Sequence, residues 1–196
     1  DSSTRRNLEL TETLREKQKR GSLLWVLDKT KTAMGGRLLR NYIEQPLIDK
    51  EEMEKRLDAI QELNQDSISR DEIREYLNPV YDLERLLSKV TYKTANPRDL
   101  IAFRNSLQML PPIKTVLAGF QKEELAAIRE EIDGLEYIYQ LIDEAIVVEP
   151  PISISEGGKI KDQFDETIDH LRAAKHDGKQ QHLQNVAAGE GANDAA

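Results

Sequence analysis

Apolar residues recur every three or four positions through most of this chain, a pattern that predicts a series of amphipathic helices. The most informative stretch spans residues 22–47. It opens with a short apolar run that contains the only tryptophan, Trp25, passes through a polar hinge at residues 28–32, and continues as a helix. Pro46 ends that helix, because the residue before a proline disfavours helical geometry. Gly35 and Gly36 each cost the helix about 1 kcal/mol, so we expect backbones to approach closely there.

Helix starts are also marked by capping residues. Asp49 can cap a helix over residues 49–64, and Glu52, three positions later, completes a capping box. Ile48 and Met53 flank this start as a hydrophobic staple. The positions expected to face the core are Met53, Leu57, Ile60 and Leu63.

Two further helix starts are marked by similar capping signals. Ser69 has Glu72 three residues later, and Asn96 is followed by Pro97 at the first helical position. Pro79 ends the helix that starts at Ser69. Apolar spacing predicts the remaining helical stretches at residues 83–90, 100–110, 113–118, 123–132, 135–146 and 163–171.

The pattern changes only once. Residues 152–155 alternate like a short strand, residues 156–158 read as a turn, and Lys159 and Ile160 can pair back. The result is seven to nine helices with at most one small β-hairpin near residues 147–161. The sequence therefore predicts an all-α, multi-helix bundle.

Composition narrows the functional classes. The chain has 196 residues, of which 33% are charged, and no cysteine, so disulfides and thiolate chemistry are excluded. No apolar run approaches 18 residues, so no membrane span is expected and a cytoplasmic location is the default. The net charge of −8 argues against a surface that wraps nucleic acid. One local basic cluster, favoured as a solvated linker, consists of Arg15, Lys17, Lys19 and Arg20.

No residue pattern indicates a catalytic, cofactor-binding or metal site. The loop at Gly157, Gly158 and Lys159 lacks the earlier glycine and the following Ser or Thr of a phosphate-binding loop. His170, His176 and His182 stand six residues apart, which turns a helix by about 240° per step and gives them no common face.

Acidic and aromatic candidates are equally weak. Adjacent carboxylates fall on polar helix faces, where solvation gives both members the same environment. The aromatic candidates for stacking on bases lack a flanking basic run, so packing is the favoured role. The acidic pairs are Glu130-Glu131, Asp143-Glu144 and Asp165-Glu166, and the aromatic candidates are Phe120, Tyr137 and Tyr139.

A series of short motifs follows in order along the chain. The first are Asp1, Thr4-Arg5-Arg6-Asn7, Leu8-Glu9-Leu10, Leu27-Asp28, Thr30, Thr32, Met34-Gly35, Arg37-Leu38-Leu39 and Gln45-Pro46-Leu47. The next are Asp82-Leu83-Glu84-Arg85-Leu86, Thr94-Ala95, Pro97-Arg98-Asp99-Leu100, Leu107 and Leu110-Pro111. The last are Pro150-Pro151, Glu156-Gly157-Gly158, Ile160, Phe164, Asp169 and Leu171-Arg172. Each motif is weak alone, but in this order they resemble the MutS family of DNA mismatch-recognition proteins. Their shared order makes the resemblance specific.

The resemblance implies the helical core domain of that family, with the start of its lever. Such a core joins the mismatch-binding and connector domains to the ATPase and relays conformational signals in DNA mismatch repair. The implied partners are the connector, ATPase and clamp domains, a homodimeric second copy, and, through the full-length protein, mismatched duplex DNA and MutL. ATP and Mg would belong to the full-length family protein, and the implied location is cytoplasmic and nucleoid-associated.

The expected domains are a helical core over residues 1–162, a last helix at 163–188 that starts the lever, and a low-complexity tail at 189–196. The resemblance ends after Lys179. The family's N-terminal mismatch wedge and P-loop ATPase are missing, so no enzymatic activity is expected and no DNA-binding residue is assigned. Alternatives left open are a stand-alone module that grips DNA backbone through the Arg15–Arg20 cluster and the last helix, and a scaffold that binds partner helices.

Overall fold

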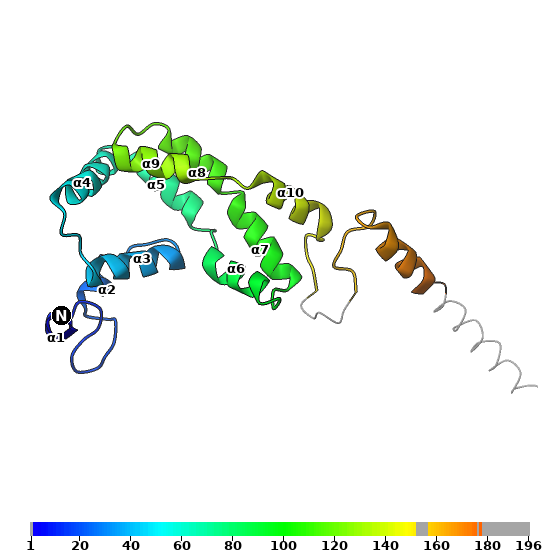
Figure 1. Cartoon of the computed structure of the whole chain (residues 1–196), viewed down its shortest axis with the longest axis horizontal. Coiled ribbons are helices and arrows are strands. Elements are labelled where there is room, and N and C mark those ends of the chain that lie inside the picture. The colour runs from blue at the N-terminus through cyan, green and yellow to red at the C-terminus, as the bar shows by residue number, and fades with distance from the viewer. Residues whose placement is uncertain (1, 152–156, 176, 178–196) are drawn as a thin grey trace, which may run out of the picture.

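The computed structural model describes residues 2–151, 157–175 and 177. Within these residues the fold is all-α, as predicted, and the helices form an elongated arrangement (Figure 1). The labelled helices are α1 (Ser2–Asn7), α2 (Leu23–Leu27), α3 (Ala33–Glu44), α4 (Lys50–Gln65), α5 (Ser67–Leu77), α6 (Leu83–Thr91), α7 (Pro97–Leu107), α8 (Leu110–Leu117), α9 (Glu123–Glu131) and α10 (Glu136–Ala145). Residues 166–175 are helical as well.

The helix count exceeds the expected seven to nine because of α1 and α2. These helices have 6 and 5 residues, too short for a periodic apolar stripe to mark them. Among the described residues, no helix is long and apolar enough to span a membrane.

Helices α4, α5, α8 and α9 enclose the main core at one end of the molecule (Figure 1). Full burial of each large apolar side chain there stabilises the fold by about 1.5–3 kcal/mol. The fully buried members are Ala59, Ile113, Leu117, Phe120 and Leu125.

Helix α7 connects this core to the rest of the bundle, because it packs against α6, α8 and α10. Its Leu107 is buried, as are Leu86 of α6 and Ile142 of α10. Ser106 is also buried, and its hydroxyl accepts a hydrogen bond from the Tyr81 N–H at 3.0 Å. That bond fixes the connection between α5 and α6 against α7.

The first three helices form a separate group, which we call the N-terminal module (residues 2–45). Its parts are joined by backbone hydrogen bonds from Leu23 to Glu9 and from Leu24 to Leu10, at 3.1 and 2.9 Å. Leu24 is buried, but no residue of α3 is fully buried. In Figure 1 the module lies at the lower left, below α4.

Local start and stop signals were mostly correct. Asp49 caps α4 by accepting the N–H groups of Glu51 and Glu52. Asn96 and Asp99 form a full capping box at α7. Helix α3 ends at Glu44, just before Pro46.

The predicted staple of α4 was wrong, and of its predicted inner face only Leu63 packs against the core. Ile48 is 94% exposed, so it cannot pack on Met53 as a staple. Leu57 is 63% exposed, and Met53 and Ile60 are exposed as well. The helix instead packs on α5 and α9 through Ala59, with Leu63 beside it. The small Ala59 side chain allows close helix contact, which periodicity alone does not reveal.

The predicted cap at Ser69 was also wrong. Asp66 is the N-cap of α5, which begins at Ser67. Its carboxylate accepts the Ser69 N–H at 3.0 Å and the Ser69 hydroxyl at 2.7 Å. A carboxylate outcompetes a hydroxyl as a cap acceptor because its hydrogen bonds are charge-assisted.

A single antiparallel bridge between Ile146 and Ile160 lies where the hairpin was predicted. The Val147 N–H donates to the Lys159 carbonyl at 3.0 Å, and the Lys161 N–H donates to the Ala145 carbonyl at 2.8 Å. The predicted strand at residues 152–155 lies outside the described residues. Past the bridge, Asp165 accepts the Ile168 N–H at 3.0 Å and starts the helix over residues 166–175.

Candidate functional site

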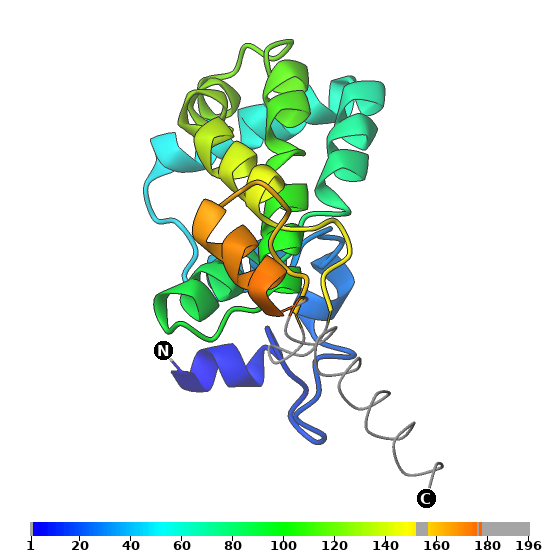
Figure 2. The ribbon, with the colours of Figure 1, turned by 90° about the vertical axis from the view of Figure 1, so that its right-hand side faces the viewer.

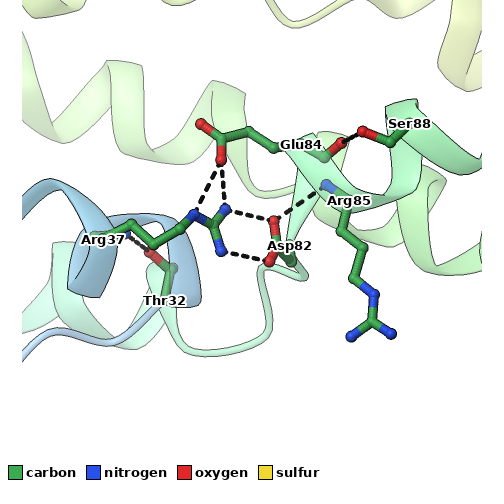
Figure 3. A network of polar contacts seen from close by, with 7 residues as sticks. Thr32, Arg37, Asp82, Glu84, Arg85 and Ser88 are labelled. Carbon is green, nitrogen blue, oxygen red and sulfur yellow. Dashed lines mark hydrogen bonds and ion pairs between the residues drawn. The ribbon is translucent and has the colours of Figure 1, made fainter.

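A bidentate ion pair joins the N-terminal module to the rest of the labelled helices, α4 to α10, which we call the bundle. The Arg37 guanidinium on α3 donates from Nη1 and Nη2 to the two carboxylate oxygens of Asp82, at 2.7 and 2.8 Å. Its Nε donates to Glu84 at 3.1 Å. Figure 3 shows the guanidinium between the two acids, which come from the start of α6. We call Arg37, Asp82 and Glu84 the charged junction.

Asp82 has two structural roles at once. It is the N-cap of α6, where its carboxylate accepts the Arg85 N–H at 3.2 Å. The hydrogen bonds from Arg37 lower the pKa of Asp82, against the opposing effect of desolvation. The same bonds raise the pKa of Arg37, so both partners stay charged near neutral pH. The junction is thereby tied to the start of α6.

The polar hinge before α3 is held by a second acid, Asp28. Its carboxylate accepts the Thr30 hydroxyl at 2.7 Å and the Thr30 N–H at 3.2 Å, and it pairs with Lys19. The hydrogen bonds from Lys19 and then from Thr30 lower the pKa of Asp28 to about 2. The hinge is therefore an ordered turn.

The glycine pair lets this hinge fold against α3. A Cβ at Gly35 would lie 3.1 Å from Thr32 Oγ1 and 3.4 Å from Thr30 Cβ. Thr32 Oγ1 cannot retreat freely, because it caps α3 by accepting the Gly35 N–H at 3.0 Å. The predicted close approach of backbones was therefore wrong, because the nearest neighbours of both glycines are side chains of the hinge.

Two more contacts hold the module on the bundle. Arg74 of α5 donates to the Lys29 carbonyl at 3.2 Å. The Arg56 guanidinium of α4 lies 3.8 Å from the centre of the Tyr42 ring on α3, a cation–π contact. These three contacts are polar or cation–π contacts, and the main apolar core includes no residue of the module. We therefore expect that the module can shift without opening that core.

A second set of polar contacts joins the bundle to residues 166–175. Arg104 of α7 pairs with Asp143 of α10 at 2.7 Å, and Lys161 donates to the Asp143 carbonyl at 2.5 Å. Arg172 donates to the Ile160 carbonyl at 2.6 Å and to Asp162 at 2.7 Å. The helix at 166–175 is thus anchored to the Ile160 side of the β-bridge.

The candidates from the sequence are not brought together. Arg15, Lys17, Lys19 and Arg20 are exposed on the N-terminal module. Gly158 adopts a positive φ of 79°, as a turn requires. His170 is exposed, whereas His176 and His182 lie outside the described residues.

The acidic pairs have structural partners. Glu130 pairs with Arg129 at 2.9 Å, and Asp143 pairs with Arg104. Phe120 is a core residue, whereas Tyr137 is exposed. Within the described ranges, no three His, Asp or Glu side chains are grouped so as to hold a metal ion.

Sequence reasoning assigned no role to the charged junction, although its members lie in two of the motifs. Arg37 belongs to the motif in α3, and Asp82 and Glu84 belong to the motif that starts α6. They stand 45 and 47 positions from Arg37. The sequence offered one clue to this pairing. No local role accounted for the cation in the first motif or for the two acids in the second.

The comparisons with known proteins agree with these motifs. The family model "MutS domain III" matches residues 3–193, so the resemblance does not stop at Lys179 as the motifs indicated. A protein of Lachnoclostridium phytofermentans is 63% identical over 179 residues, which cover 91% of this chain and 19% of that protein. Proteins of Ruminiclostridium cellulolyticum and Acetivibrio thermocellus are 54% and 50% identical, over 91% of this chain and 20% and 21% of theirs. All three are named DNA mismatch repair protein MutS.

The chain thus spans about a fifth of the length of these relatives. Its helical fold and its ordered motifs fit the same assignment. The chain belongs to the MutS domain III family.

Proposed function

We propose that this chain is the mechanical core of a DNA mismatch repair protein, which relays conformational change between a DNA-binding part and a nucleotide-binding part. It carries no catalytic residue itself. ATP and Mg bind elsewhere in the full-length protein, as do mismatched duplex DNA and MutL. Its direct partners are the connector, ATPase and clamp domains of the same polypeptide and a second copy in a homodimer.

The charged junction carries this proposal. A relay needs an element with two arrangements whose equilibrium both ends can bias. The N-terminal module meets the bundle through Arg37, Arg56 and Arg74 and buries no α3 residue fully. When polar contacts of this kind open, water can replace the lost hydrogen bonds. An apolar interface that opened would instead lose its hydrophobic stabilisation. A force applied to the N-terminal module is thus expected to move α3 relative to α6.

Spin labels can test this motion directly, because the chain has no native cysteine. Asn41→Cys on α3 and Thr91→Cys on α6 place one label on each side of the junction. We expect one narrow distance distribution for the parent chain and a broader or shifted one after Arg37→Gln. An unchanged distribution in the variant would show that the junction does not hold the module.

The relay itself needs the full-length context. The chain can replace the matching 179 residues of the Lachnoclostridium phytofermentans protein, to which it is 63% identical. We expect Arg37→Gln in that chimera to weaken the effect of mismatched DNA on ATP hydrolysis and to leave hydrolysis without DNA unchanged. Arg129→Gln, which breaks a pair between adjacent residues within α9, is the matched control. An equal loss in both variants would refute the assignment to the junction.

A further inference from the structure

Charge is distributed unevenly along the chain. Residues 1–48 carry ten Lys and Arg residues against six Asp and Glu residues, whereas the whole chain has a net charge of −8. The N-terminal part is therefore positive, at +4, and the remainder is negative, at −12. A positive surface on an otherwise acidic protein favours the approach of a polyanion to that one end.

The cations are displayed on an ordered loop. The Thr13 N–H donates to the Gln18 carbonyl at 2.9 Å, and the Lys17 N–H donates to the Thr13 carbonyl at 3.1 Å. The Leu14 N–H donates to the Glu9 carboxylate at 2.7 Å. We call residues 13–20 the basic loop. In Figures 1 and 2 it projects from the end of the molecule that holds α1 and α2.

Most of its charge is available to a ligand. Lys19 pairs with Asp28. Across the part of the chain that the structure describes, Arg15, Lys17 and Arg20 form no ion pair, and all three are exposed. Glu16 in the same loop offsets one of these charges.

The only tryptophan, Trp25, follows this loop closely in the sequence. Ser22 is buried. Its hydroxyl donates to the Lys19 carbonyl at 2.6 Å and accepts a hydrogen bond from the backbone N–H of Trp25 at 3.2 Å. This one side chain fixes the end of the basic loop to α2. Trp25 nevertheless remains 49% exposed, on a helix of 5 residues. The end of the basic loop and the backbone of α2, which carries the half-exposed indole, are thereby held together.

We propose that the basic loop and Trp25 form a binding site for single-stranded DNA. Arg15, Lys17 and Arg20 contact phosphates, and the Trp25 indole stacks on an unpaired base. Proteins that bind single strands combine a positive surface with an aromatic side chain on which a base stacks. A duplex satisfies only the phosphate contacts, because its bases are already stacked. The site goes beyond the relay and does not depend on it.

The arrangement sets the expected salt dependence. Three phosphate contacts to a single strand give a slope of about −2 in a plot of log affinity against log salt. Raising salt fourfold should therefore weaken binding about 20-fold. Loss of one stacked base should weaken binding by a further tenfold or so.

The chain's only tryptophan reports on the contact. A 20-nucleotide oligothymidine labelled with a dye is titrated at low salt, and its anisotropy and the Trp25 fluorescence are followed. We expect saturable binding with quenching of Trp25. The triple variant Arg15→Gln, Lys17→Gln, Arg20→Gln should bind at least tenfold more weakly and lose the steep salt dependence. Trp25→Leu should weaken binding about tenfold and keep the salt slope.

A matched control removes three exposed lysines outside the module, by Lys50→Gln, Lys93→Gln and Lys175→Gln. It has the same net charge as the triple loop variant and should bind like the parent chain. A duplex of the same length and a polyglutamate peptide complete the comparison. The duplex should bind more weakly than the single strand and leave Trp25 unquenched. The proposal would be overturned by an equal loss in the control, by duplex binding as tight as single-strand binding, or by polyglutamate binding as tight as DNA binding. No binding to the single strand at low salt would overturn it too.

Discussion

Replacing Ser106 by alanine tests how the bundle positions the charged junction. Ser106 is 0% exposed within α7. Its hydroxyl donates to the Ala102 carbonyl at 2.8 Å and accepts the Tyr81 N–H at 3.0 Å. Tyr81 directly precedes Asp82, so this hydrogen bond fixes the backbone that leads into the junction.

The cost of Ser106→Ala follows from the lost acceptor. A buried N–H without a partner costs about 1–3 kcal/mol. The bond from Tyr81 is partly buried, so we expect a loss in the lower half of that range, about 1–2 kcal/mol. With a urea m-value of about 2 kcal/mol per molar, the unfolding midpoint should fall by about 0.5–1 M.

Urea unfolding followed by circular dichroism at the helical band measures this shift. The matched control is Ser88→Ala on α6, whose hydroxyl donates to the Glu84 carbonyl at 2.8 Å on the exposed surface. That variant should leave the midpoint unchanged, since water replaces the lost bond. An unchanged midpoint for Ser106→Ala, or an equal shift in both variants, would refute the reasoning.

Three further predictions concern the hinge and the core. Gly35→Ala should lower thermal stability despite its helix-propensity gain of about 1 kcal/mol, because its Cβ would meet the capping Thr32 oxygen at 3.1 Å. Gly36→Ala, whose nearest contact would be 3.4 Å, should raise it, and the reverse order in calorimetry would contradict the packing argument. Asp28 has a pKa of about 2, below its ordinary 3.8, so its contribution to stability is present above about pH 4 and is lost as pH falls toward 2. Asp28→Asn should remove that part of the acid sensitivity in pH-dependent urea unfolding. Phe120→Ala should cost about 3–5 kcal/mol and lower the melting temperature by roughly 6–20 °C, and a smaller shift would place Phe120 outside the cooperative core.

Local chemistry could be predicted from the sequence because it depends on neighbours along the chain. Asn96 followed by Pro97 marked α7, and Pro46 marked the end of α3. The buried face of α4 could not be predicted in this way. Its large apolar residues gave the stronger periodic signal, but the small side chain of Ala59 decides which face fits against α5 and α9. Burial of a helix face depends on the shape of its partners, and periodicity carries no information on that shape.

The charged junction shows the same limit at longer range. Nothing local links Arg37 to Asp82, because the pairing depends on how α3 folds back over the start of α6. The hinge that directs this return was visible as a polar segment, but its internal hydrogen bonds were not. Sequence motifs therefore identified the family and included the residues of the site, and only the fold assigned those residues to one another.

The bundle and the junction are stabilised by different forces, and this difference determines how the chain responds to load. The core around Ile113, Leu117 and Phe120 is apolar and fully buried, so any displacement there loses hydrophobic stabilisation and leaves voids. The contacts of Arg37 are exposed ion pairs, which contribute little to stability and can exchange for water. A force on the N-terminal module should therefore open the junction before it deforms the bundle. Motion is then expected at the junction, as the proposed relay between distant sites requires.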